Sequence, residues 1–210
     1  TAHGFSNGDS IRITNILGMT QLNGRSFTLA NITTNTFELS AEDGTDHTAY
    51  ASGGQAQELT QTISGLDHLE GETVQILADG AVHPERTVSS GQISLDWPLA
   101  KAQVGLGFSA VLTTLPNYSG AQNGSGIGKI KGWSRLVVKV IETLGGKIQG
   151  EAVINRWAGD AMDGPPLLYT GELEANSLGY DTAAQVSIEQ DQPLPFHILS
   201  LSGTLDVHDG

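Results

Sequence analysis

The sequence predicts an all-β protein, and three observations support this fold class. Apolar and polar residues alternate with a period of two in many short runs, the pattern of half-buried strands. No segment carries a long, capped stripe of apolar residues at helical spacing. Turn-forming pairs, which tolerate positive φ, separate the alternating runs: Asn7-Gly8, Asn23-Gly24, Asp43-Gly44, Asp79-Gly80, Asn123-Gly124 and Asp163-Gly164. We expect a small β-barrel followed by β-rich domains of sandwich or barrel type.

The first expected domain covers residues 1–57. In SIRITNI, Ile11 and Ile13 share one face of a strand, and Asn15 joins them if the alternation continues. The runs RSFTLANI and NTFELSA follow, and their alternating apolar residues are Phe27, Leu29, Phe37 and Leu39. These strands predict a small β-barrel that ends in the loop SGGQAQ.

The remaining chain divides into residues 58–116 and residues 117–210. The former has expected strands in ETVQILAD, ERTVSSGQISLD and QVGLGFSAVLTTLP. The polar, glycine-rich stretch NYSGAQNGSGIG (117–128) then predicts a loop or hinge. Further strands are expected in SRLVVKVIETLG, PLLYTGELEA, AQVSIEQD and PFHILSLSGTLDV. We expect the last two segments to pack together as one domain.

The charge and composition narrow the possible functions. The 210 residues include 23 acidic and 10 basic side chains, a net charge of -13, so long-range attraction to nucleic acid is not expected. An acidic wall would instead suit a conduit through which DNA slides. Without cysteine, the chain has no disulfide, thiolate zinc site or cysteine nucleophile. No apolar run is long enough to span a membrane, and the sequence leads us to expect no signal peptide. Because the chain begins with Thr1, we expect a fragment of a longer protein.

Two short motifs resemble sites of known chemistry but are incomplete. In GSGIGK (124–129), Lys129 is followed by Ile130 rather than Ser or Thr, and strand patterns lie downstream, so a flexible loop is expected. The run LDHLEGE gathers Asp67, His68, Glu70 and Glu72, but its spacing matches no calcium loop. The aromatic content of 6% is low for a sugar-cleaving cleft. We therefore expect no enzyme, no metal and no cofactor.

One local charge feature stands out. Six of the ten basic residues fall within one stretch: Lys129, Lys131, Arg135, Lys139, Lys147 and Arg156. In SRLVVKVIE, basic and apolar residues alternate, which predicts a strand with one face in the core and a basic outer face. That face would meet water, an acidic partner or nucleic acid. Our candidate subunit-contact residues are Lys129, Lys131, Arg135 and Lys139.

The first segment resembles the first catalytic-cysteine half-domain of the ubiquitin-activating enzyme. The matching residues are His3, Gly4, Phe5, Gly8, Asp9, Gly18, Met19, Leu22, Asn23, Gly24, Thr36, Phe37, Tyr50, Gly53 and Gly54. These residue types suit turns and a packed barrel, and Asn23 is a residue that tolerates left-handed turn geometry. Since none is catalytic in that family, the resemblance implies a shared scaffold without the chemistry.

The rest of the chain, from about Gly65 to Val207, resembles tail nozzle or tail tube proteins of short-tailed bacteriophages. The resemblance rests on GLDHLEGETVQILADGAVHPERTVSSGQISLDWPLAKAQVGLGFSAVLTTLP and GKIKGWSRLVVKVIETLGGKI, and then on PPLLYTGELEA and SIEQDQPLPFHILSLSGTLDV. Such proteins are considerably longer, so the chain would be their C-terminal part.

This resemblance implies a structural protein of the virion tail. Its partners would be other copies of itself in a ring, commonly a hexamer, and other tail proteins. DNA would pass through the ring without specific binding. Two other functions remain open: a receptor- or carbohydrate-binding β module on the tail, and cell-wall hydrolysis at the tail tip. The first would need a cluster of exposed aromatic residues, and the second a defined acid pair or nucleophile.

Overall fold

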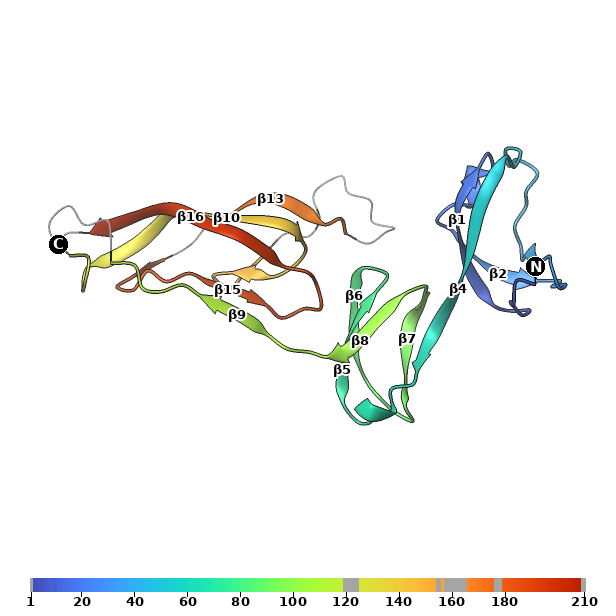
Figure 1. Ribbon diagram of the computed structural model, residues 1–210, viewed down its shortest axis with the longest axis horizontal. Helices are drawn as coiled ribbons and strands as arrows, with labels where there is room; N and C mark the ends of the chain where they lie inside the picture. Colours follow the sequence, from blue (N-terminus) through green and yellow to red (C-terminus); the bar gives the residue numbers. More distant parts are fainter. Residues whose placement is uncertain (1, 119–124, 154–155, 157–165, 176–178, 209–210) are drawn as a thin grey trace. The chain divides into compact units, whose positions relative to one another are not determined.

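The computed structural model describes residues 2–118, 125–153, 156, 166–175 and 179–208 (Figure 1). Within these ranges the chain forms sixteen strands in four antiparallel sheets. Its helical segments are two short 3-10 turns, η1 (Thr20–Leu22) and η2 (Asp67–Leu69). The all-β prediction is confirmed. In the described part of the chain, no helix is long and apolar enough to cross a membrane.

The chain divides into two compact units. The first comprises Thr1–Val74 and Glu85–Gln103, and the second comprises Gln75–Pro84 and Val104–Gly210. A three-stranded sheet has residues in both ranges; its order is β6-β5-β8, with bounds Thr73–Ala78 for β5, Ala81–Thr87 for β6 and Ala102–Leu106 for β8. The segment expected at residues 58–116 thus contributes to both units.

The first unit contains a five-stranded sheet with the order β3-β2-β1-β4-β7. The bounds are Ser10–Leu17 for β1, Ser26–Ala30 for β2, Glu38–Leu39 for β3, Ser52–Ser64 for β4 and Gln92–Leu99 for β7. One long strand, β4, pairs with β1 from Ser52 to Leu59 and with β7 from Thr60 to Ser64. This strand therefore runs without interruption past residue 57.

A compact apolar cluster forms the core of the N-terminal part of the first unit. Its buried members are Ile11, Ile13, Ile16, Leu22, Phe27 and Leu29, and the predicted residues Phe37 and Leu39 pack against it. Asn15 does not continue the inner face of β1. It is exposed and has a φ of 61°, which breaks the alternation and brings Ile16 inward in its place.

The second unit contains two four-stranded sheets. In one, the order is β13-β10-β14 and β16 pairs with the other edge of β10. Its bounds are Ile130–Thr143 for β10, Tyr169–Ala175 for β13, Tyr180–Asp181 for β14 and His197–His208 for β16. The other sheet has the order β12-β11-β15-β9, with bounds Ala110–Thr113 for β9, Lys147–Ile148 for β11, Glu151–Ala152 for β12 and Ser187–Gln190 for β15.

The core of the second unit joins its two sheets. Leu136, Val138 and Val140 of β10 are fully buried, and they cluster with Ile148 of β11 and Ile188 of β15. Side chains from both sheets therefore meet in one core, as in a β-sandwich. Figure 1 shows β10 and β16 running alongside each other over most of the length of this unit.

Candidate functional site

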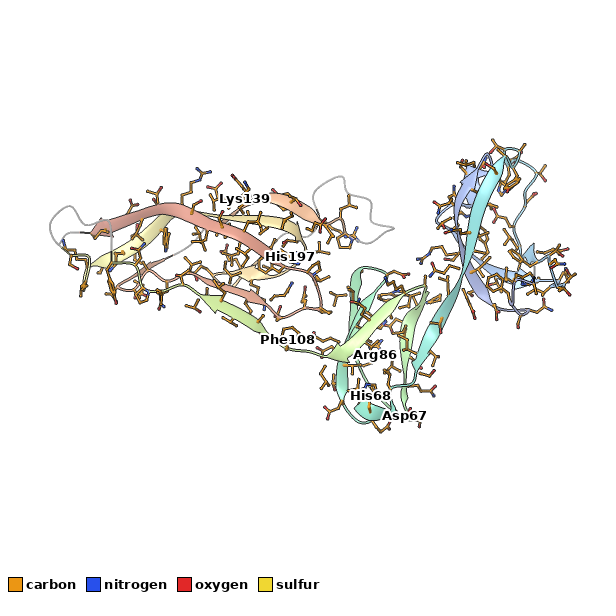
Figure 2. The ribbon with its side chains drawn as sticks, in the orientation of Figure 1. Asp67, His68, Arg86, Phe108, Lys139 and His197 are labelled. Carbon is orange, nitrogen blue, oxygen red and sulfur yellow. The ribbon has the colours of Figure 1, made fainter. Side chains whose placement is uncertain are left out.

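The basic strand predicted from sequence is β10. Leu136, Val138 and Val140 are completely buried, whereas Arg135 and Lys139 are exposed. The predicted alternation of an apolar inner face and a basic outer face is confirmed over this part of the strand. Lys139 lies on the outer surface of the sheet (Figure 2).

Acidic residues of the same chain accompany this basic face. The Arg135 guanidinium Nε lies 3.0 Å from a carboxylate oxygen of Glu174 on β13. Lys139 pairs in the same ladder with Glu172, which also lies on β13. The local sequence offers no partner for the basic side of β10, and the partner of Arg135 lies on a distant strand of the same chain. The acid that it meets lies 39 residues away, so no local pattern revealed it.

Lys131 does not lie on the exposed face. Its side chain is fully buried, and its ammonium donates hydrogen bonds of 2.6 Å to the carbonyl oxygens of Gly126 and Thr182. The ammonium also lies 5.2 Å from the ring centroid of Tyr118. Lys131 therefore acts as a clamp, in the sense that it joins the backbone at Gly126 to the backbone at Thr182 inside the unit. Its ammonium is not available to a neighbouring subunit.

A β-bulge explains why the sequence misplaced Lys131. In the ladder with β16, Trp133 pairs with Leu205 and Arg135 pairs with Thr204, so Ser134 is an extra residue. One extra residue exchanges the two faces of a strand. Odd-numbered residues therefore point inward before Ser134 and outward after it. Lys129, the remaining candidate, precedes the strand and is half-buried.

The acidic run LDHLEGE has a structural role. Asp67 and His68 lie in η2 (Figure 2). The Glu70 carboxylate accepts hydrogen bonds from the backbone N–H groups of Ser90 (2.9 Å) and Gly91 (2.7 Å), which lower the pKa of Glu70. Across the described residues, no three His, Asp or Glu side chains are grouped so that they could hold a metal ion.

The glycine-rich motif around Lys129 leads into a strand. Ser125 Oγ accepts a hydrogen bond of 3.2 Å from the backbone N–H of Ile127, and β10 begins at Ile130. A phosphate-binding loop would instead open a helix, whose N-terminal N–H groups face the anion. The beginning of this motif, at Gly124, lies outside the described residues.

Sequence analysis did not identify a charged cluster in the first unit. Arg25 and Glu42 form a bidentate ion pair, with both N–O distances 2.6 Å, and His47 Nε2 lies 3.2 Å from the same carboxylate. The hydrogen bonds from Arg25 lower the pKa of Glu42. The Arg25 guanidinium also lies 4.8 Å from the Phe27 ring centroid. The cluster fastens the segment after β3 to the start of β2.

Asn23 fixes the geometry of β1 from outside the strand. Its side-chain amide donates to the Ile16 carbonyl oxygen and accepts from the Ile16 N–H, both at 2.8 Å. Its own backbone is extended, with a φ of -67°, so Asn23 does not use the left-handed conformation that asparagine tolerates. The side chain instead satisfies the backbone of β1 beside the irregularity at Asn15.

Comparison with known families identifies the N-terminal part of the chain. Residues 1–60 match the family model described as the ubiquitin-activating enzyme E1 FCCH domain. The N-terminal part of the chain is therefore an FCCH-like domain, which contains β1, β2, β3 and most of β4. No curated protein matches the chain.

Proposed function

We propose that the chain is a structural component of a bacteriophage virion, part of a tail nozzle or tail tube that lines the DNA-ejection channel. The observation that carries this proposal is the resemblance of residues 65–207 to tail proteins of short-tailed phages. The chain would then be located in the phage tail. Its partners would be copies of itself in a ring, possibly a hexamer, and neighbouring tail proteins.

The FCCH-like domain is consistent with a structural role. The residues that carry the family match act on the backbone: Asn23 holds the Ile16 backbone, and Gly18 has a φ of 91° where a side chain would overlap the Ala49 carbonyl. These are requirements of folding. The domain would therefore act as a β scaffold added to the tail protein.

The charge supports passage of DNA without binding. With a net charge of -13, the chain as a whole offers no long-range electrostatic attraction to DNA phosphate. The exposed Arg135 is paired with Glu174, which reduces the positive charge available on β10. A smooth passage requires such weak interaction, because sequence-independent binding would slow the moving DNA.

Immunoelectron microscopy tests the proposal. Antibodies raised against the 210-residue chain should label the tail end of short-tailed particles produced by the phage that encodes it. Labelling of the capsid, or absence of the chain from purified particles by mass spectrometry, would refute the proposal. A glycan array provides the second measurement: specific binding of a sugar would favour the receptor-binding alternative.

A further inference from the structure

The strongest unassigned surface of the second unit lies along β9. All four residues of this strand are exposed, and Val111 and Leu112 retain 61% and 49% of their accessible surface. The flanking residues Phe108 and Leu115 are 80% and 87% exposed. Figure 2 shows Phe108 on the segment that leads into β9. Adjacent strand residues point to opposite faces, so apolar surface is uncovered on both sides of β9.

One side of the β9 backbone pairs with no strand among the described residues. β9 is the terminal strand of its sheet, and β15 is its neighbour. The Thr114 N–H donates to the Val186 carbonyl, so in an antiparallel ladder the next residues bonded to β15 are Leu112 and Ala110. Val111 and Thr113 therefore direct their N–H and C=O groups outward. An occupant that satisfies these groups must present extended backbone.

A second unprotected edge lies on the other sheet. β16 is twelve residues long and pairs with β10 on one side, and no described strand pairs with its other side. Proteins usually protect such edges with Lys or Pro, yet β16 contains neither. Leu199 of this strand is 57% exposed. Asp206 is its one carboxylate.

The charge distribution indicates which partner fits these edges. Two copies of a chain with a net charge of -13 repel each other, except where their surfaces are neutral. Residues 102–128 contain no Asp, Glu, Lys or Arg, and this neutral run includes the whole of β9. The edge of β16 is nearly neutral as well. These are surfaces on which another copy of this acidic chain can approach.

We propose that β9 of one copy pairs with the outer edge of β16 of the next copy, and that this pairing is the subunit contact. Two different edges make the contact head-to-tail, which is the type of interface that forms a ring when its rotation closes. The inference rests on the proposed ring assembly and names its surface. It replaces the exposed cations of β10 as the main contact, since Arg135 already has an acidic partner.

Single-cysteine cross-linking tests the pairing directly, because the chain has no cysteine of its own. Thr113→Cys on β9 and Ser202→Cys on β16 are prepared separately. Each variant alone, and an equal mixture of the two, is then brought to the highest soluble concentration and treated with a short bismaleimide. The mixture should give a cross-linked dimer that neither variant gives alone. Equal cross-linking within Thr113→Cys alone would indicate β9–β9 pairing and overturn the proposal, as would no dimer in the mixture.

Sedimentation provides the second measurement. Val111→Pro removes an N–H that points away from β15, so it blocks the outer edge without breaking the internal ladder. It should weaken self-association by about tenfold. Val111→Lys is the second edge variant, and circular dichroism checks that both fold. Leu167→Lys, a matched control at an apolar residue that is 81% exposed and lies on neither strand, should associate like the parent chain.

These outcomes separate the inference from the proposed function. If antibodies label phage tails but the mixture forms no β9–β16 cross-link, the subunit contact is wrong and the tail assignment stands. If the cross-link forms but the antibodies do not label tails, the contact stands and the tail assignment is wrong. Equal association of Val111→Lys, Leu167→Lys and the parent chain would also overturn the contact.

Discussion

Arg25 and Glu42 face each other in parallel, with each guanidinium Nη 2.6 Å from one carboxylate oxygen. The pair joins residues that are 17 positions apart in the FCCH-like domain. His47 approaches the same carboxylate, so one acidic side chain organises the segment that follows β3. Such bidentate pairs combine charge with fixed geometry.

This pair predicts a pH dependence of stability. The pKa of Glu42 is held below its ordinary value of 4.5 by the hydrogen bonds from Arg25. Stability from this interaction is therefore complete above pH 4.5 and is lost as the pH falls through the lower, folded-state pKa. Glu42→Gln should lower the melting temperature at neutral pH and reduce its fall in acid. Glu58→Gln, an exposed change on β4, is the control. Identical melting curves for Glu42→Gln and the parent chain at all pH values would contradict the prediction.

The close approach at Gly18 predicts a large effect of a single methyl group. Gly18 and Gly24 both have positive φ, at 91° and 79°, so alanine at either position should cost about 1–2 kcal/mol in backbone strain. At Gly18 the new Cβ would also overlap the Ala49 carbonyl oxygen, whereas at Gly24 it meets open space. Gly18→Ala should therefore cost about 1–3 kcal/mol more in chemical denaturation. Equal losses for the two variants would show that the backbone relaxes at Gly18.

The continuity of β4 sets where the FCCH-like domain can be cut. The sequence predicts a first domain of residues 1–57, and Leu59, two residues beyond it, is 7% exposed and pairs with Ser10 of β1. A chain of residues 1–60 should unfold cooperatively, and a chain of residues 1–57 should be less stable because it lacks this buried leucine. Calorimetry compares the two. If neither shows a transition, the domain requires the rest of the first unit, including β7.

Because the ammonium of Lys131 is buried, removing it should lower the free energy of unfolding, whereas removing the same charge from the surface should not. Lys131→Met would leave the carbonyl oxygens of Gly126 and Thr182 without this donor. The expected cost is about 1–3 kcal/mol for each carbonyl that stays buried and unsatisfied. Lys139→Met removes the same charge from an exposed position and should be close to neutral. Equal denaturation midpoints for the two variants would disprove the clamp.

The Arg135–Glu174 pair predicts a weak coupling. Its side chains are 61% and 55% exposed, so a double-mutant cycle should give about 0–1 kcal/mol. The double variant Arg135→Glu/Lys139→Glu places acids beside Glu174 and Glu172 and should lower the free energy of unfolding. Changing Glu174 and Glu172 to Lys in the same chain should restore that loss. If β9 and β16 form the subunit contact, the double variant Arg135→Glu/Lys139→Glu should leave ring assembly largely intact. If this variant stays folded but no longer forms a ring, the subunit contact lies on β10 instead.

The sequence predicted the fold class and much of both cores, because strand alternation is local. It placed Phe27, Leu29, Leu136 and Val138 correctly. It failed at two positions where the backbone departs from regular alternation. At Asn15 in β1 the φ is positive although the ladder with β4 keeps its register, and in β10 Ser134 is an extra residue before Arg135. A bulge leaves no compositional signal, so Lys131 was assigned to the wrong face.

The surroundings of the candidate contact residues depend on which strands pair, and strand pairing cannot be inferred from local alternation in one sequence. Whether a basic strand faces a partner subunit or an acidic strand of its own chain is decided by the sheet order. The order β13-β10 brings Glu174 to Arg135, and the terminal position of β9 leaves Val111 uncovered. Both facts arise from long-range topology, to which local alternation is insensitive.

The pairing of β10 with β16 has a consequence for synthesis of the protein. The ladder runs from Ile130 with His208 to Ile141 with His197, so every pair joins distant parts of the chain. A ribosome adds about 5–20 residues per second, so β10 emerges several seconds before its partner does. During that interval the hydrogen-bonding groups of its open side are exposed to other nascent chains on the same messenger RNA. The core of the second unit can therefore close only after the C-terminal strand has been synthesised.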